Sequence, residues 1–158
     1  MNPNSTETTM IRTAMTIAEA ATAHGDVPVG AVIVDGTGQV IASGHNTRER
    51  DDDILGHAEI NAITAAIKHT GSRVLGDCTL FITLEPCAMC AAVIASARIP
   101  RVVFGAWDEK AGAAGSVYDL LRDGRLPHPV PEVVGGVLAD ECARQLSDFF
   151  SGLRPSRS

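Results

Sequence analysis

The segment LEPCAMC at residues 84–90 constrains this chain more than any other stretch, because it places two cysteines three positions apart directly after a proline. Proline favours the first turn of a helix, and the apolar residues 87–97 are typical of a short buried helix. Cys87 and Cys90 then share one side of the helix start, where the helix dipole favours thiolates. Such pairs occur in redox proteins, structural zinc sites and catalytic zinc sites.

Helical and strand-like patterns alternate along the chain. Helices are predicted at residues 6–24, 57–69, 87–97, 116–122 and 139–152, and strands at residues 29–35, 39–45, 78–84 and 101–107. The first two strands flank the turn GTG and form a predicted hairpin, while residues 46–53 and 108–116 are predicted loops. Strands alternating with helices predict one three-layer α/β domain.

The composition fits a globular domain, with 158 residues of which 45% are hydrophobic and 20% charged. The N-terminal MNPNSTETT has neither a basic start nor an apolar stretch, and no run approaches the length of a membrane span. We therefore expect a cytoplasmic protein without a membrane partner, in which thiols stay reduced. The four cysteines are then metal ligands, catalytic groups or core residues.

A zinc ion bound by the cysteine pair needs further ligands, because zinc in proteins is usually four-coordinate. Cys78 and Cys142 stand alone in a predicted strand and a predicted helix, so we interpret them as core residues. The remaining candidates are the five histidines. Among these, His57 begins the predicted helix at 57–69 and is followed two positions later by Glu59.

A site made of His57, Cys87 and Cys90 leaves one coordination position for water, which is typical of catalytic zinc. Glu59 lies about 200° round the helix from His57, at about 3.6 residues per turn, so its carboxylate is expected to approach the water rather than bind the metal. Zinc lowers the pKa of its water and a nearby carboxylate moves the proton, as hydrolysis requires. A thioredoxin-like redox pair would leave His57 and Glu59 unexplained.

The motifs HAE at 57–59 and PCAMC at 86–90 match the H-x-E and P-C-x-x-C signature of zinc deaminases, so the chain resembles the cytidine deaminase-like superfamily. The segments VPVGAVIV, TLEPCAMC, RVVFGA, KAGAAGS and LADECARQLSDFF make it similar to bacterial tRNA-specific adenosine deaminases. The resemblance implies a three-layer α/β/α cytidine deaminase-like fold with a central mixed five-stranded sheet. It also implies a zinc-dependent deaminase domain at 9–153 between flexible tails at 1–8 and 154–158.

In the family that the chain resembles, zinc-bound hydroxide attacks C6 of the wobble adenosine of tRNA, ammonia leaves and inosine results. Carried over by position, His57, Cys87 and Cys90 hold one zinc ion per subunit. Glu59 moves the proton from water to the ring and then to the leaving amine. The implied partners are a tRNA anticodon stem-loop and a second copy of the chain, because the family is homodimeric and RNA touches both subunits.

Five further residues match substrate-contacting positions of the family. They are Val29, which lines the base pocket, Asn46, which contacts the flipped nucleoside, Asp108 and Lys110, which lie near the RNA, and Phe149, beside the flanking nucleotides. Without the resemblance, Val29 is interpreted as a strand core residue and Asn46 as a turn former. Asp108 and Lys110 are then solvated loop charges, and Phe149 is a helix core residue.

The chain departs from the family pattern in two loops. Asp-Ile-Leu-Gly at 53–56 replaces the usual Asp-Pro-Thr-Ala, and Pro-His-Pro at 127–129 stands where many relatives have Asn-His-Arg. Both changes affect expected RNA contacts. The net charge of −6 gives no general attraction to RNA, so binding needs a local basic patch. The basic residues that remain to supply this patch include Arg98, Arg101, Arg144, Arg154 and Arg157.

Two other functions share part of this pattern. A deaminase of a free nucleobase or nucleoside, of guanine, cytosine or adenine type, has both zinc motifs. The C-terminal SDFF helix and the KAGAAGS loop, which match the tRNA enzymes, argue against that reading. A non-catalytic deaminase-like subunit that only binds RNA would have no use for Glu59 beside an open zinc position.

Overall fold

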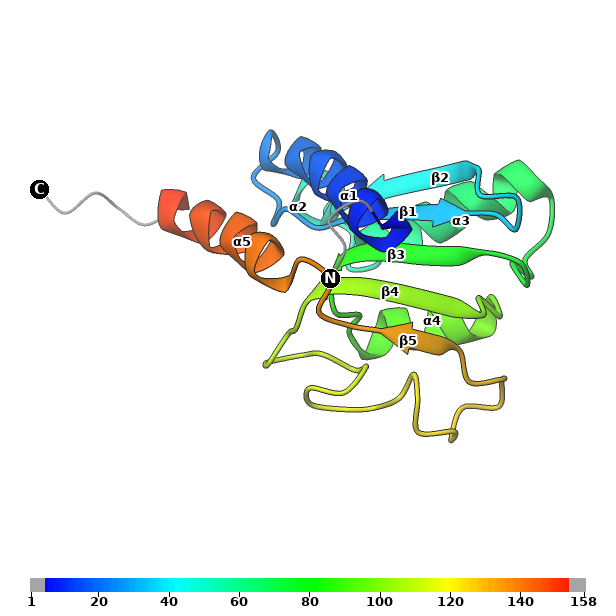
Figure 1. The fold of residues 1–158 in the computed structure, drawn as a ribbon. Helices are drawn as coiled ribbons and strands as arrows, with labels where there is room; N and C mark the ends of the chain where they lie inside the picture. The colour runs from blue at the N-terminus through cyan, green and yellow to red at the C-terminus, as the bar shows by residue number, and fades with distance from the viewer. Residues whose placement is uncertain (1–4, 154–158) are drawn as a thin grey trace, which may run out of the picture.

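A computed structural model describes residues 5–153 and contains a five-stranded sheet in the order β2-β1-β3-β4-β5 (Figure 1). The strands are β1 (Gly30–Val34), β2 (Val40–His45), β3 (Thr79–Leu84), β4 (Arg101–Ala106) and β5 (Glu132–Val134). β1 is antiparallel to both of its neighbours, whereas β3, β4 and β5 run parallel to one another. The predicted mixed five-stranded sheet is confirmed.

Helices cover both faces of the sheet. They are α1 (Thr6–Thr22), α2 (Arg48–Asp51), α3 (Ala58–Thr70), α4 (Ala88–Ser96) and α5 (Ala139–Leu153). Alternate residues of β1 pack into two different hydrophobic clusters, one on each face of the sheet, because successive side chains of a strand point to opposite faces. Val32 and Val34 pack with α1, and Ala31 and Ile33 pack in the cluster that contains α3 and α4. The predicted three-layer α/β/α architecture is confirmed.

Glycines let two helices approach the sheet closely. A Cβ at Gly44 of β2 would lie 2.6 Å from the backbone nitrogen of Ala62 in α3, nearer than real Cβ atoms come. A Cβ at Gly30 of β1 would likewise overlap the backbone of α1 at Ala14. Both contacts lie at the end of the sheet next to residues 29 and 46. They therefore fix the distance of α1 and α3 from this end of the sheet.

The prediction of a helix at 116–122 is wrong. The backbone N–H groups of Val117 and Tyr118 both donate to the carbonyl of Gly112, at 3.0 Å, and Gly115 has a φ of 130°. This left-handed backbone at Gly115 folds the segment into turns, so the regular bonds of a helix cannot form.

Two short elements lie where the patterns showed none. In the loop predicted at 46–53, α2 forms because the buried Asp26 accepts hydrogen bonds from the backbone N–H groups of Glu49 and Arg50. β5 lies in a proline-interrupted stretch and pairs with β4 from Glu132 onward. Both α2 and β5 depend on contacts with residues distant in sequence, and local periodicity cannot predict such contacts.

The chain ends bear on the predicted tails. α1 begins at Thr6, inside the range predicted as a tail, because the side chain of Ser5 accepts a hydrogen bond from the N–H of Thr8 and caps the helix. Residues 1–4 and 154–158 lie outside the described residues. Between residues 5 and 153, no helix has the length and apolar character that crossing a membrane requires.

Candidate active site

One edge of the sheet gathers segments that are distant in sequence. Because β1 runs opposite to its neighbours, its start lies beside the ends of β2, β3 and β4. A pocket of about 290 Å³ opens at this edge. It is lined by Val27, Val29, Asn46, Arg48, His57, Ala58, Glu59, Leu84, Glu85, Cys87, Asp108 and Ala111.

The structure brings the three predicted zinc ligands together. The Nδ1 atom of His57 lies 3.6 Å from Sγ of Cys87 and 3.4 Å from Sγ of Cys90. Zn–S bonds of about 2.3 Å and Zn–N bonds of about 2.1 Å in a tetrahedron place sulfur and nitrogen about 3.6 Å apart, so the donor set fits zinc. Within residues 5–153, these side chains form one such group of candidate metal ligands.

Helix starts supply this geometry. His57 is the N-cap residue of α3 and Cys87 is the N-cap residue of α4, and neither side chain makes a capping hydrogen bond. Both remain free to bind a metal at the point where the two helices meet. Cys90, one turn into α4, is fully buried behind Cys87.

The surroundings of Cys87 favour its thiolate form even without a metal ion. A hydrogen bond from Cys90, and secondarily one from His57, lower the pKa of Cys87 to about 4 against the opposing effect of burial. The same hydrogen bond and burial raise the pKa of Cys90. One thiolate thus faces the pocket, and a divalent cation would stabilise the second.

The remaining two cysteines belong to the core. Cys78 and Cys142 are both 1% exposed, one in each hydrophobic cluster. Burial raises the pKa of Cys78 to about 12 and that of Cys142 to about 11, so both thiols stay protonated at neutral pH. Their interpretation as core residues is confirmed.

Glu59 lines the pocket without belonging to the group of candidate metal ligands. It lies in the first turn of α3 and is 4% exposed. Burial raises its pKa to about 7. A carboxyl group with a pKa near neutrality is suited to accept and return a proton.

A second buried carboxylate, Glu85, holds the loop that follows β4. It accepts hydrogen bonds of 3.0 Å from the backbone N–H groups of Asp108, Ala114 and Ser116, and another from the Ser116 hydroxyl. Burial acts to raise the pKa of Glu85, but these bonds keep it below the usual value. A Cβ at Gly112 would overlap the carboxylate, so the loop closes around it only with glycine there.

Three of the five predicted substrate contacts line the pocket, namely Val29, Asn46 and Asp108. Asn46 also acts as a turn former, because its Nδ2 donates to the carbonyl of Val27 and its Oδ1 accepts from the N–H of Arg48. Asp108 accepts hydrogen bonds from the backbone of Lys110 and Ala111. Lys110 is exposed on the same loop, outside the pocket lining.

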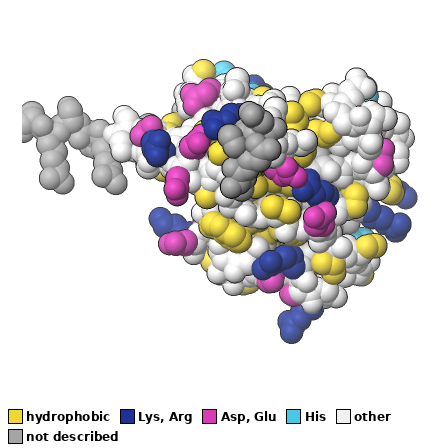
Figure 2. Space-filling model, viewed as in Figure 1, with side chains coloured by type: hydrophobic (Ala, Val, Ile, Leu, Met, Phe, Trp, Pro, Cys, Tyr) yellow, Lys and Arg dark blue, Asp and Glu magenta, His cyan; other side chains and the backbone are white. Residues whose placement is uncertain are grey.

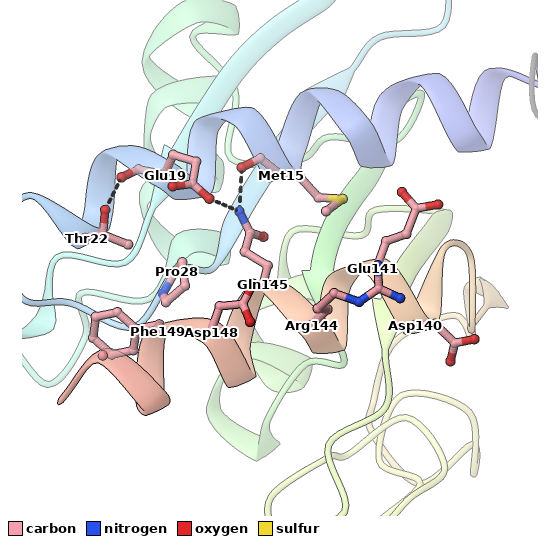
Figure 3. A pocket seen from close by; sticks show the side chains of 11 residues that line it. Met15, Glu19, Thr22, Pro28, Asp140, Glu141, Arg144, Gln145, Asp148 and Phe149 are labelled. Carbon is pink, nitrogen blue, oxygen red and sulfur yellow. Dashed lines mark hydrogen bonds between the residues drawn. The ribbon is translucent and has the colours of Figure 1, made fainter. Parts of the chain in front are cut away.

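Phe149 lies in a different depression, a groove of about 1030 Å³ between α1 and α5. Figure 3 shows its ring near the end of α5, with Pro28 and Gln145 in the same groove. Gln145 joins the helices by donating to the carbonyl of Met15 and to the carboxylate of Glu19. Pro28 separates two pocket residues in the sequence, so the groove and the pocket share this segment as a wall.

Two of the arginines considered for a basic patch, Arg101 and Arg144, lie apart. Arg101 begins β4, at the opposite end of the strand from the pocket, and is paired with Glu7 and Glu132. Arg144 lines the groove between α1 and α5. On the face shown in Figure 2, basic and acidic side chains are interspersed. Arg154 and Arg157 lie outside the described residues.

Residues that the sequence patterns did not indicate also line the pocket. For Glu85 a signal existed, because a carboxylate between an apolar strand and Pro86 needs donors, and the glycine-rich loop at 110–116 offers backbone N–H groups. No comparable signal pointed to Arg48. Its place at the pocket depends on α2, and therefore on hydrogen bonds to the distant Asp26.

An α/β/α fold in which a His–Cys–Cys group and a buried glutamate share a pocket defines the class of zinc-dependent deaminases. The family model of the cytidine and deoxycytidylate deaminase zinc-binding region matches residues 4–106 of the chain, which confirms zinc as the cofactor. A tRNA-specific adenosine deaminase of Bacillus subtilis (strain 168) is 44% identical over 140 residues, covering 89% of this chain and 86% of the relative.

Two solved structures share the fold. One, from a study of A-to-I editing by tRNA:A34 deaminases at the wobble position, has a TM-score of 0.83 and 38% identity, covering 88% of this chain and 99% of that one. The other, guanine deaminase from Bacillus subtilis, has a TM-score of 0.61 and 29% identity, covering 95% and 96%. The chain belongs to the family defined by the cytidine and deoxycytidylate deaminase zinc-binding region and, within it, to the tRNA-specific adenosine deaminase family.

Replacing a predicted ligand should remove the metal. We expect about one zinc ion per wild-type chain by elemental analysis, and nearly none in Cys87→Ala or Cys90→Ala, because two remaining ligands bind zinc poorly. Cys142→Ala is the matched control and should keep its zinc, since this thiol is buried and protonated. Wild-type zinc content in Cys87→Ala would contradict the assignment of the ligands.

Removing the charge of Glu85 should loosen the loop at 108–116. Glu85→Gln replaces one acceptor oxygen by an NH₂ group that faces N–H donors, which should lower the free energy of unfolding by about 2 kcal/mol. Hydrogen exchange at Asp108, Ala114 and Ser116 should accelerate. The control is Glu109→Gln, an exposed carboxylate on the same loop. Equal protection of this loop in both variants would show that Glu85 does not hold it.

Proposed function

We propose that the protein hydrolyses adenosine to inosine at the wobble position of tRNA in the cytoplasm. One observation carries this proposal: His57, Cys87 and Cys90 meet at a pocket that also contains the buried carboxylate of Glu59. The identity of 44% with a tRNA-specific adenosine deaminase over most of both chains supports the choice of substrate. The reaction consumes water, releases ammonia from C6 and leaves a carbonyl oxygen there.

The residues divide the chemistry among them. His57, Cys87 and Cys90 would hold zinc, which when bound supplies a water molecule activated for attack at near-neutral pH. Glu59 accepts a proton from this water, transfers it to the purine ring and assists departure of the amine as ammonia. Its burial suits this role, because a carboxyl group with a pKa near neutrality exchanges protons readily in both directions.

The remaining lining positions the base. A base inside a duplex or a stacked loop must turn out of its stack to reach such a pocket. We propose that the apolar Val29 contacts the flipped base, that Asn46 and Asp108 contact the nucleoside, and that Lys110 lies near the RNA backbone. Phe149 would contact a flanking nucleotide along the groove next to Pro28.

Glu59→Ala tests the catalytic assignment. With an arginine tRNA anticodon stem-loop that carries a wobble adenosine, the wild-type protein should form inosine, and the variant should be at least about 100-fold slower because the proton carrier is lost. Inosine is measured by nucleoside mass spectrometry, and the zinc content of the variant should equal that of the wild type.

The same assay includes free adenine, guanine and cytosine, with ammonia as the readout. Ammonia from a free base without inosine in RNA would replace the tRNA proposal by a free-base deaminase. RNA binding without any product would favour a non-catalytic subunit.

We further propose that the protein is a homodimer. Four large apolar side chains are exposed on two loops near the pocket: Ile54 at 76%, Leu55 at 51%, Val117 at 46% and Tyr118 at 56%. Covering such side chains by a second copy would remove apolar surface from water. Light scattering at micromolar concentration should give the mass of two chains, and the mass of one chain would contradict the proposal.

A further inference from the structure

Among the side chains that line the pocket, acidic groups outnumber lysine and arginine. Glu59, Glu85 and Asp108 contribute carboxyl groups. Among the described residues that line the pocket, Arg48 is the one lysine or arginine. Arg48 is exposed to solvent, whereas Glu59 and Glu85 are buried, so Arg48 lies on the open side of the pocket.

Arg48 differs from several other arginines in having no carboxylate partner. Arg12, Arg101 and Arg122 are each ion-paired to an acidic side chain. Arg50, two residues away on α2, is paired with Asp51 at 2.9 Å. Within the described residues, Arg48 makes no ion pair, which leaves its guanidinium available to an anion.

The backbone that carries Arg48 is held firmly. Asp26, with 0% exposure, accepts hydrogen bonds from the N–H groups of Glu49 at 2.6 Å and of Arg50 at 3.1 Å. The N–H of Arg48 itself donates to Oδ1 of Asn46, a lining residue, at 3.0 Å. Because this backbone is already anchored, little main-chain conformational entropy is lost when the Arg48 side chain binds a ligand. This favours a specific contact.

A phosphodiester is the anion that fits this position. The carboxylates of the lining disfavour an anion inside the pocket, whereas a guanidinium at the opening can form two parallel hydrogen bonds with phosphate oxygens. A nucleotide within an RNA chain brings such a phosphate when its base enters. A free base or nucleoside brings none.

We propose that Arg48 binds a phosphate flanking the flipped adenosine and thereby favours a nucleotide within an RNA chain over a free base or nucleoside. This inference rests on the proposed tRNA deaminase function and assigns one source of its preference for RNA. The contact is local, so it operates despite the net charge of −6.

The test compares Arg48→Ala, Arg48→Lys and Arg50→Ala with the wild type on the wobble-adenosine stem-loop at several salt concentrations. Arg48→Ala should lower kcat/KM about tenfold, mainly through KM, by losing one charged hydrogen-bonding group. Its plot of log Kd against log salt concentration should flatten by about one unit, as expected for one lost phosphate contact. Arg48→Lys should restore the salt dependence and part of the affinity.

Arg50→Ala removes a neighbouring exposed ion pair and should behave like the wild type. Zinc content and Tm should be unchanged in all three variants. Inosine formation by the wild type together with unchanged KM and salt dependence in Arg48→Ala would overturn the role of Arg48 alone. Stem-loop binding that depends on Arg48, without inosine from the wild type, would uphold the phosphate contact and overturn the proposed reaction. Wild-type protein that neither binds nor converts the stem-loop would overturn both.

Discussion

The starts of α3 and α4 must meet within the span of one metal ion, and much of the structure serves this constraint. His57 and Cys87 are N-cap residues of two helices that follow different strands. The sheet brings them together because β1 lies antiparallel between β2 and β3, so the segments that precede these helices emerge at one edge. Close packing of α3 against Gly44 then limits how far the His57 end of the helix can move.

Two buried carboxylates position the two loops beside the metal ligands in the same way. Asp26 binds backbone N–H groups of α2, and Glu85 binds those of the loop at 108–116. A buried charge is costly unless it is fully hydrogen-bonded, so each carboxylate favours one conformation of its loop. Arg48 stands on the first loop, and Asp108 and Lys110 stand on the second. Two residues with no assigned role in the reaction therefore set the shape of the pocket opening.

The distribution of charge makes the acidic composition compatible with the RNA substrate that we propose. Several arginines are neutralised by acidic partners, and Arg101 in particular is occupied by Glu7 and Glu132 far from the pocket. For the RNA substrate that we propose, one unpaired cation suffices if it lies where a phosphate arrives. The proposed role of Arg48 thus needs no extended basic surface, and it is compatible with the interspersed charges of Figure 2.

The sequence by itself determined the features that depend on local spacing and ligand chemistry. Helix-like patterns predicted α1, α3, α4 and α5, and apolar strand-like runs predicted four strands. The donor types of His57, Cys87 and Cys90, with Glu59 two residues after the histidine, predicted a zinc pocket with a carboxylate. Resemblance to known deaminases added the fifth strand and the substrate.

Only the tertiary structure decided the features that depend on contacts across the chain. It placed Phe149 in a separate groove and converted the helix predicted at 116–122 into turns. It also brought Glu85 and Arg48 to the pocket. In the turn region and in the two loops, hydrogen bonds to distant or non-helical partners outweigh local preference, and neither periodicity nor composition reports the direction in which a loop side chain points.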